Sequence, residues 1–155
     1  MKPSVVFLAG LALCWGGALF AGEGHQHSSG GEMVKAQAMA QEAVSYQQAL
    51  KETIQILSGM NHFPSDEQKA RLDVMIAAMD SSVNGVALAE TMGVLKRVQH
   101  SPSADDKARL QSLIAQVKDA QGDARLIDLM QILSNLSHKV SDADAQRLQQ
   151  MSAEL

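Results

Sequence analysis

Three of the five histidines recur at a constant spacing of 38 residues, and they are the first candidates for chemistry in this chain. They are His62, His100 and His138, and each follows an apolar stretch. We expect each imidazole at the end of a helix, where it bonds the last free carbonyls and complements the helix dipole. A second interpretation places the three in a row, in which neighbouring imidazoles share a metal ion such as zinc, copper or nickel.

The two remaining histidines lie close together in a Gly/Ser-rich stretch near the N-terminus. His25 and His27 flank Gln26, and Met33 follows a few residues later. Alternate imidazoles close to a free N-terminus suit copper, nickel or zinc, and a thioether suits Cu(I). One hypothesis is therefore that His25, His27 and Met33 bind a metal ion. The simpler interpretation is a flexible leader without a specific role.

The repeated histidines belong to an internal repeat, which is the strongest pattern in the sequence. Three segments align without a gap, and the first two copies share 12 of their first 24 positions. A fixed period of this length is typical of a supersecondary unit that buries one face against the next copy. We therefore predict an all-α domain of three tandem 38-residue helical hairpins, as an open array or a closed helical bundle. The predicted repeats are residues 49–86, 87–124 and 125–155.

Each predicted hairpin begins with a helix whose apolar residues recur at intervals of four, three and three. This spacing lines one face of an α-helix, and one further apolar position widens the face in every copy. The second helix of each copy shows a similar periodicity, which Ser152 interrupts in the last copy. The first-helix stripes are Leu50, Ile54, Leu57 and Met60; Leu88, Met92, Leu95 and Val98; and Leu126, Met130, Leu133 and Leu136.

Serines mark the start of each second helix. Ser65, Ser103 and Ser141 stand where a hydroxyl accepts a hydrogen bond from a free backbone N–H, a contact worth roughly 1 kcal/mol. Gln68 follows Ser65 by three residues and completes a capping box. These signals predict that the second helices begin directly after the serines.

Charges recur at matched positions of the two helices. Each first helix carries an acid and each second helix an arginine, roughly level with one another along the hairpin. We expect an ion pair within each hairpin, worth less than about 1 kcal/mol where it is exposed. The expected pairs are Glu52–Arg71, Glu90–Arg109 and Asp128–Arg147.

The first 21 residues are typical of a secretory signal peptide. Lys2 is followed by a short apolar run and a small residue, and we expect cleavage after Ala21, with Ala18 as the second candidate. The run is short and glycine-rich for a membrane span. Lipid attachment at Cys14 is a minor alternative, because Leu13 is large for the residue that precedes such a cysteine. We expect a periplasmic or secreted protein without stable membrane insertion after signal removal.

The predicted mature chain has two parts. Residues 22–31 form a flexible Gly/Ser/His tail, and residues 32–155 form one helical-repeat domain. The segment Glu32–Gln47 is rich in Ala and Gln, and we predict it as an N-terminal capping helix, because the terminal face of a repeat stack needs a cover. No such helix follows Leu155, so the last hairpin exposes apolar surface unless the array closes or a partner covers it.

The composition of the chain argues against several classes of function. Cys14 is the only cysteine, so the mature chain holds no disulfide, thiolate metal site or thiol nucleophile. Without Lys2 it carries 12 basic and 17 acidic residues, which argues against a nucleic-acid partner. The sequence contains no HExxH, nucleophile elbow, phosphate-binding glycine loop or dinucleotide fingerprint. We expect no enzymatic activity and no cofactor, and the aromatic content of 3% disfavours a haem pocket.

The leading functional hypothesis is an exported, non-enzymatic binding or scaffolding protein. Helical arrays offer extended faces for peptides and proteins, and the C-terminal hairpin offers a surface for a protein partner or for self-association. The alternative is a periplasmic metal-binding protein for copper, nickel or zinc, which uses the N-terminal and the repeated histidines.

Overall fold

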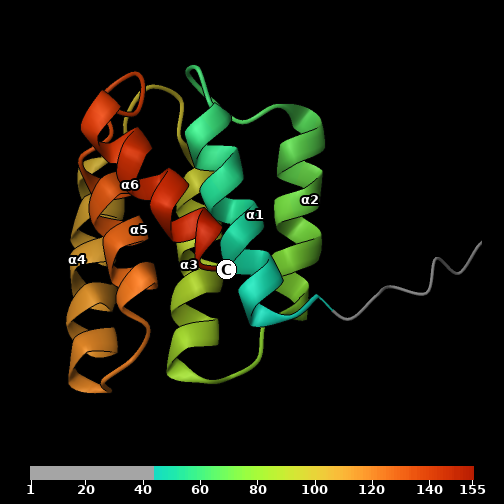
Figure 1. Cartoon of the computed structure of the whole chain (residues 1–155), viewed down its shortest axis with the longest axis vertical. Coiled ribbons are helices and arrows are strands. Elements are labelled where there is room, and N and C mark those ends of the chain that lie inside the picture. Colours follow the sequence, from blue (N-terminus) through green and yellow to red (C-terminus); the bar gives the residue numbers. More distant parts are fainter. Residues whose placement is uncertain (1–43) are drawn as a thin grey trace, which may run out of the picture. The chain divides into compact units, whose positions relative to one another are not determined.

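The computed structural model describes residues 44–155, and this part of the chain is all-helical (Figure 1). The predicted signal peptide, the histidine tail and most of the predicted capping helix lie outside the described residues. None of the helices described has the length and apolar character needed to cross a membrane. The six helices are α1 (Tyr46–Gly59), α2 (Asp66–Ala78), α3 (Val83–Arg97), α4 (Ala104–Asp119), α5 (Ala124–Ser134) and α6 (Asp142–Ala153).

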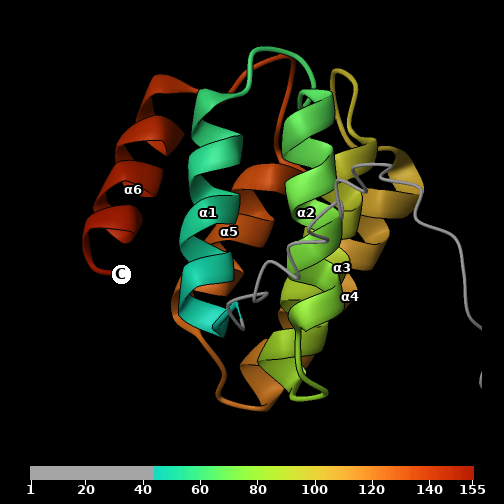
Figure 2. The same cartoon turned by 90° about the vertical axis from the view of Figure 1, so that its right-hand side faces the viewer.

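These helices form a closed bundle rather than an open row. The odd-numbered helices α1, α3 and α5 pack against one another. Each even-numbered helix contacts two of them: α2 contacts α1 and α3, α4 contacts α3 and α5, and α6 contacts α5 and α1. The contact between α6 and α1 joins the last helix to the first, and both views place these two helices side by side (Figures 1 and 2).

Closure covers the apolar stripe of the C-terminal helix. Leu148 is fully buried and Met151 is 6% exposed, because α6 packs on α1 and α5. Among the described residues, the contact of α6 with α1 therefore covers apolar side chains that an open array would expose or leave to a partner.

The apolar stripes form the core, as predicted. Every residue of the three first-helix stripes is at most 5% exposed, and the widening positions Ile56, Val94 and Ile132 are also buried. Two polar residues share this core, Thr53 and Thr91. Each hydroxyl donates to the carbonyl oxygen four residues earlier at 2.7 Å, so no buried side-chain polar atom of residues 44–155 lacks a partner.

Capping serines begin the second helices at the predicted positions. The hydroxyls of Ser65, Ser103 and Ser141 each accept a hydrogen bond from the backbone N–H three residues later. Ser65 and Gln68 form the reciprocal capping box, with the Ser65 N–H donating to the Gln68 side chain at 2.8 Å. The predicted starts of these helices are therefore confirmed.

The start of α1 corrects one predicted boundary. We expected the upstream capping helix to run through Gln47, but Tyr46 and Gln47 belong to α1. The reason is Ser45, which has an extended backbone and whose hydroxyl accepts from the Gln48 N–H at 3.2 Å. The rest of the predicted capping helix, residues 32–43, lies outside the described residues.

The predicted ion pairs within the hairpins are confirmed. Arg71 donates two hydrogen bonds to the carboxylate of Glu52, at 2.5 and 2.6 Å. The equivalent pairs are Arg109–Glu90 at 3.0 Å and Arg147–Asp128 at 2.8 Å. The bonds from Arg71 lower the pKa of Glu52, and they outweigh the opposing effect of partial burial.

Candidate functional site

The three repeated histidines lie in the loops that follow the odd-numbered helices. α1 ends at Gly59, α3 at Arg97 and α5 at Ser134, so each histidine stands beyond the helix rather than in its last turn. Within residues 44–155, no imidazole bonds a helix-end carbonyl. Backbone N–H groups satisfy these carbonyls instead, as where Met60 donates to Leu57 at 3.4 Å. The expected helix-end hydrogen bond of the imidazoles is therefore wrong for the described structure.

The tertiary structure brings the three imidazoles together. The ring centroids of His62 and His100 are 5.6 Å apart, and those of His100 and His138 are 5.3 Å apart. Both pairs meet edge to face, with interplanar angles of 80° and 71°. The packing of α1, α3 and α5 against one another gathers the loops after these helices at one end of the bundle, the upper end in Figure 1. We refer to these three residues as the histidine cluster.

His138 has a backbone conformation that is rare for a residue with a side chain. Its φ is 62°, and the Lys139 N–H donates to the Ser137 carbonyl across it at 2.7 Å, so His138 is the middle residue of a tight three-residue turn. Such a conformation costs on the order of 1 kcal/mol or more. The His138 N–H also donates to the His100 carbonyl at 2.7 Å, which ties the two loops together and holds the turn in place.

The histidine cluster offers pairs of ligands rather than a ready three-ligand site. Within residues 44–155, no three His, Cys, Asp or Glu side chains are placed to hold one metal ion between them. His100 belongs to both close pairs, and all three residues of the cluster are exposed. An ion bound here would therefore be held by two imidazoles and water.

A shallow basic pocket of about 300 Å³ adjoins His100 and is also lined by Phe63. Its three cations are each paired with a carboxylate, so little unbalanced positive charge faces the histidine cluster. Burial disfavours the ionised form of Asp106, but hydrogen bonds from Arg97 and Ser103 prevail and lower its pKa. The three pairs are Lys69–Asp66 at 3.5 Å, Lys96–Asp73 at 2.5 Å and Arg97–Asp106 at 2.6 Å.

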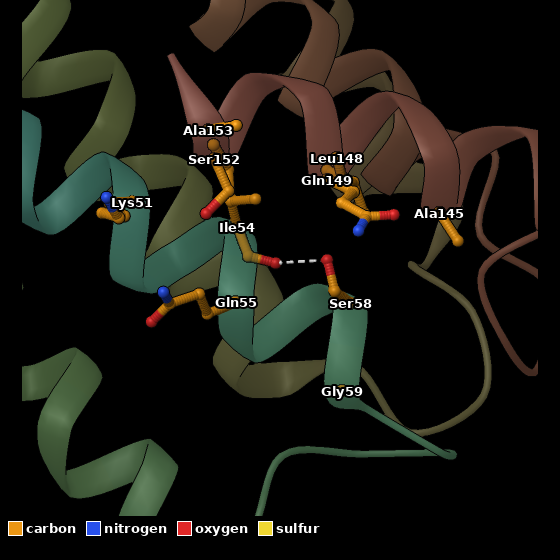
Figure 3. Close-up of a pocket in the computed structure, with 10 residues that line it drawn as sticks. All are labelled: Lys51, Ile54, Gln55, Ser58, Gly59, Ala145, Leu148, Gln149, Ser152 and Ala153. Atoms are coloured by element: carbon orange, nitrogen blue, oxygen red, sulfur yellow. Dashed lines mark hydrogen bonds between the residues drawn. The ribbon is translucent and has the colours of Figure 1, made fainter. Parts of the chain in front are cut away.

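A second candidate site is a groove between α1 and α6, where the bundle closes (Figure 3). Its volume is about 690 Å³, and the fully buried side chains of Ile54 and Leu148 lie at its base. The Ser58 hydroxyl donates to the Ile54 carbonyl at 2.8 Å, so it is engaged within its own helix. We refer to this feature as the α1–α6 groove. It is lined by Lys51, Ile54, Gln55, Ser58, Gly59, Ala145, Leu148, Gln149, Ser152 and Ala153.

The groove arises from small side chains on α6. Ser152 stands where the equivalent position of α4, one repeat earlier, carries Ile114 and that of α2, two repeats earlier, carries Ile76. On the α1 side, a Cβ added to Gly59 would meet no atom within 4 Å. The break in the apolar stripe at Ser152 was visible in the sequence, but the groove was not. Its two walls are 86 to 102 residues apart in the sequence and meet only because α6 packs against α1.

A polar cluster that no sequence pattern indicated lies where α1 and α5 begin. The hydroxyl of Tyr46 donates to the carboxylate of Asp123 at 3.3 Å, and Arg125 donates to the same carboxylate at 2.9 and 3.0 Å. Burial raises the pKa of Tyr46, as does the neighbouring Asp123. Burial opposes ionisation of Asp123, but the bonds from Arg125 prevail and lower its pKa. The arrangement joins the start of α5 to α1 and serves the fold.

The N-terminal candidate ligands His25, His27 and Met33 lie outside the described residues. A scan against protein-family models, a search of curated proteins and a search of solved structures each returned no match.

Proposed function

We propose that this chain is an exported, non-enzymatic binding protein that receives a protein partner in the α1–α6 groove. The observation that supports the proposal is the composition of this groove between α1 and α6. Its base is apolar, and small and amide side chains surround it. Concave sites with an apolar base and a few polar groups at the edge are typical binding sites. The groove includes one face of the C-terminal hairpin, where the sequence analysis placed the partner surface.

The lining of the groove suggests the chemistry of the partner. An apolar side chain of the partner would fill the space above Ile54 and Leu148. Gln55 and Gln149 offer amide groups to the partner's backbone, and Lys51 is the only charged residue of the lining, so it suits a carboxylate. The partner segment is therefore expected to combine an apolar anchor with a neighbouring acidic group.

A peptide selection tests this proposal with a matched pair of variants. Peptides selected from a random library on the mature chain are measured against Ala153→Trp, which fills the groove, and against Ala115→Trp. Ala115 is the equivalent residue of α4, one repeat earlier, and is also exposed. We expect the selected peptides to carry an apolar residue next to an acidic one. They should lose at least tenfold in affinity for Ala153→Trp and keep it for Ala115→Trp.

Two outcomes would contradict the groove proposal. Peptides that bind both variants equally would use another surface. A mature chain that selects no peptide above background would have no peptide site in the groove. Sedimentation of the two variants tests the self-association alternative, since only Ala153→Trp would dissociate an oligomer that is held through the groove.

A second candidate function is metal binding in the periplasm, with copper, nickel or zinc as the ion. The observation in its favour is the contact between successive imidazoles of the histidine cluster. Calorimetric titration of the mature chain and of a His25→Ala/His27→Ala variant tests the contribution of the tail. We expect the tail variant to lose one binding event and to keep another; loss of all binding would assign metal uptake to the tail alone.

Export itself is part of the proposal and has a direct test. The chain is expressed with its own N-terminus in a Gram-negative host, and the periplasmic fraction is examined by N-terminal sequencing. We expect a mature protein that begins at Gly22. Retention of Met1 on the bulk of the protein would contradict export through this signal.

A further inference from the structure

We propose that His100 and His138 form a two-imidazole site for a divalent transition-metal ion, with His62 as a peripheral member of the histidine cluster. This inference rests on the metal-binding alternative and deepens it, because it names the residue pair inside the helical domain. It is independent of the N-terminal tail and of the α1–α6 groove. The ions of the expected class are zinc, copper and nickel, all of which accept imidazole nitrogen.

The separation of the rings matches such a site. A zinc–imidazole nitrogen bond is about 2.0–2.1 Å long, and the nitrogen lies about 1 Å from the ring centre, so two rings on one tetrahedral ion have centroids roughly 5–6 Å apart. The observed separations are 5.3 Å for His100–His138 and 5.6 Å for His62–His100. The edge-to-face pairs therefore need ring rotation to aim their nitrogens at one ion, but no separation of the loops. Because both residues are exposed, that rotation meets little obstruction.

The backbone distinguishes one pair from the other. The His138 N–H donates to the His100 carbonyl at 2.7 Å, whereas no hydrogen bond among the described residues joins the backbones of His62 and His100. His138 also sits in the tight turn with φ at 62°, a conformation that the surrounding contacts must impose. A pair of ligands whose loops are already joined loses less freedom when the ion binds. The joined loops therefore favour His100 and His138 as the primary pair.

The charges around the cluster permit a bound cation. The basic groups of the adjoining pocket come from α2, which contributes Lys69, and from α3, which contributes Lys96 and Arg97. Each of these is already paired with an aspartate, as described above. Lys139 follows His138 directly and is exposed, so solvent screens its repulsion. The remaining coordination positions of the ion are open to water, because both ligands face solvent.

Since His100 belongs to both close pairs, the cluster should bind a single ion. Occupation of the His100–His138 pair removes His100 from any site with His62. A third imidazole can reach the same ion only if His62 rotates toward it. We therefore expect one ion per chain in the helical domain.

The test uses the chain without its two tail histidines. In the His25→Ala/His27→Ala variant the only histidines left are those of the cluster. Zinc chloride and copper(II) chloride are titrated calorimetrically into this parent and into three further variants that add His62→Ala, His100→Ala or His138→Ala. Copper(II) electron paramagnetic resonance counts the nitrogens that coordinate the ion. Circular dichroism checks that each histidine variant keeps its helices.

The parent is expected to bind one ion with a dissociation constant below about 0.1 mM, and its copper spectrum should show two imidazole nitrogens. His100→Ala and His138→Ala should each weaken binding at least tenfold, whereas His62→Ala should change it less than threefold. A parent that binds no tighter than about 0.1 mM would overturn the site. A loss in His62→Ala equal to that in His138→Ala would overturn the assignment of the pair. Binding that is present in the full chain and absent from the parent would leave the tail as the metal site and overturn this one.

Discussion

The backbone N–H of His138 donates to the carbonyl oxygen of His100 at 2.7 Å, across two loops that are 38 residues apart in the sequence. This bond holds His138 in the left-handed region, with φ at 62°. It also sets the shortest imidazole separation in the histidine cluster, 5.3 Å between ring centroids. The same hydrogen bond therefore joins the strained backbone of His138 to the loop of His100, whose imidazole lies against that of His138.

The strain at His138 predicts opposite effects for two substitutions. Glycine adopts a positive φ without steric cost, so we expect His138→Gly to leave the free energy of unfolding unchanged or to raise it by up to about 1 kcal/mol. Valine is disfavoured there, so we expect His138→Val to lower it by about 1–2 kcal/mol. Urea unfolding in the presence of a chelator measures both. His62, which lacks a positive φ, is the control, and equal behaviour at the two positions would refute the strain.

The contact between α6 and α1 makes Leu148 a test of closure. Leu72, Leu110 and Leu148 are equivalent by the 38-residue repeat, and all three are fully buried. Changing each to alanine should lower the free energy of unfolding by about 2–5 kcal/mol, because each leaves a cavity in a packed core. A loss below about 1 kcal/mol for Leu148→Ala alone, measured by urea unfolding, would mean that α6 does not close the bundle in solution.

The ion pair of Glu52 and Arg71 predicts a pH-dependent contribution to stability. The hydrogen bonds from Arg71 lower the pKa of Glu52, so protonation is harder in the folded state than in the unfolded state. The stabilisation is therefore present above the usual glutamate pKa of about 4.3 and is lost as the pH falls through the lower folded-state value. We expect Glu52→Gln to cost up to about 1 kcal/mol at pH 7, and we expect its difference in stability from the wild type to shrink as the pH falls toward 3.

The matched control for this pair is Glu90→Gln. The Glu90–Arg109 bond is longer, at 3.0 Å, and its carboxylate side chain is 42% exposed against 24% for Glu52. Its effect at pH 7 should therefore be smaller than that of Glu52→Gln. Urea unfolding of both variants at pH 7 and pH 3 checks the comparison, and a difference for Glu52→Gln that persists unchanged at pH 3 would argue against the proposed linkage.

Substitution by alanine should change the stability differently at two glycines, Gly85 and Gly59. A Cβ on Gly85, in the first turn of α3, would lie 2.6 Å from the carbonyl oxygen of Asp80, so Gly85→Ala should lower the free energy of unfolding by about 1–3 kcal/mol. Gly59 ends α1 and has open space around it, so Gly59→Ala should be neutral or stabilising by up to about 1 kcal/mol. Thermal unfolding measures both. A Gly85→Ala variant as stable as the wild type would show that the loop before α3 shifts to accommodate the added methyl group.

Local features of the sequence were sufficient to predict the helices of residues 44–155, apart from the start of α1. The spacing of Leu50, Ile54 and Leu57 requires a helix with one apolar face, and the same pattern recurs in the other copies. Ser65 and its equivalents mark the starts of the second helices, because the capping bond joins residues three positions apart. Glu52 and Arg71 were also predicted to pair, since a hairpin places residues at equal distances from its turn opposite one another. Each of these depends on short-range geometry, which the order of residues determines.

The features that bear on function depended on how the helices pack. The 38-residue repeat is compatible with an open array and with a closed bundle, and only the contact of α6 with α1 decides between them. The groove above Ile54 and Leu148 exists because that contact brings together two helices from opposite ends of the domain. The approach of His100 to His138 likewise depends on the mutual packing of α1, α3 and α5. By itself, the sequence determined the helices, their caps and the recurrence of the histidines. The tertiary structure alone decided which of these surfaces meet, because the energy of packing belongs to contacts between residues far apart in the chain.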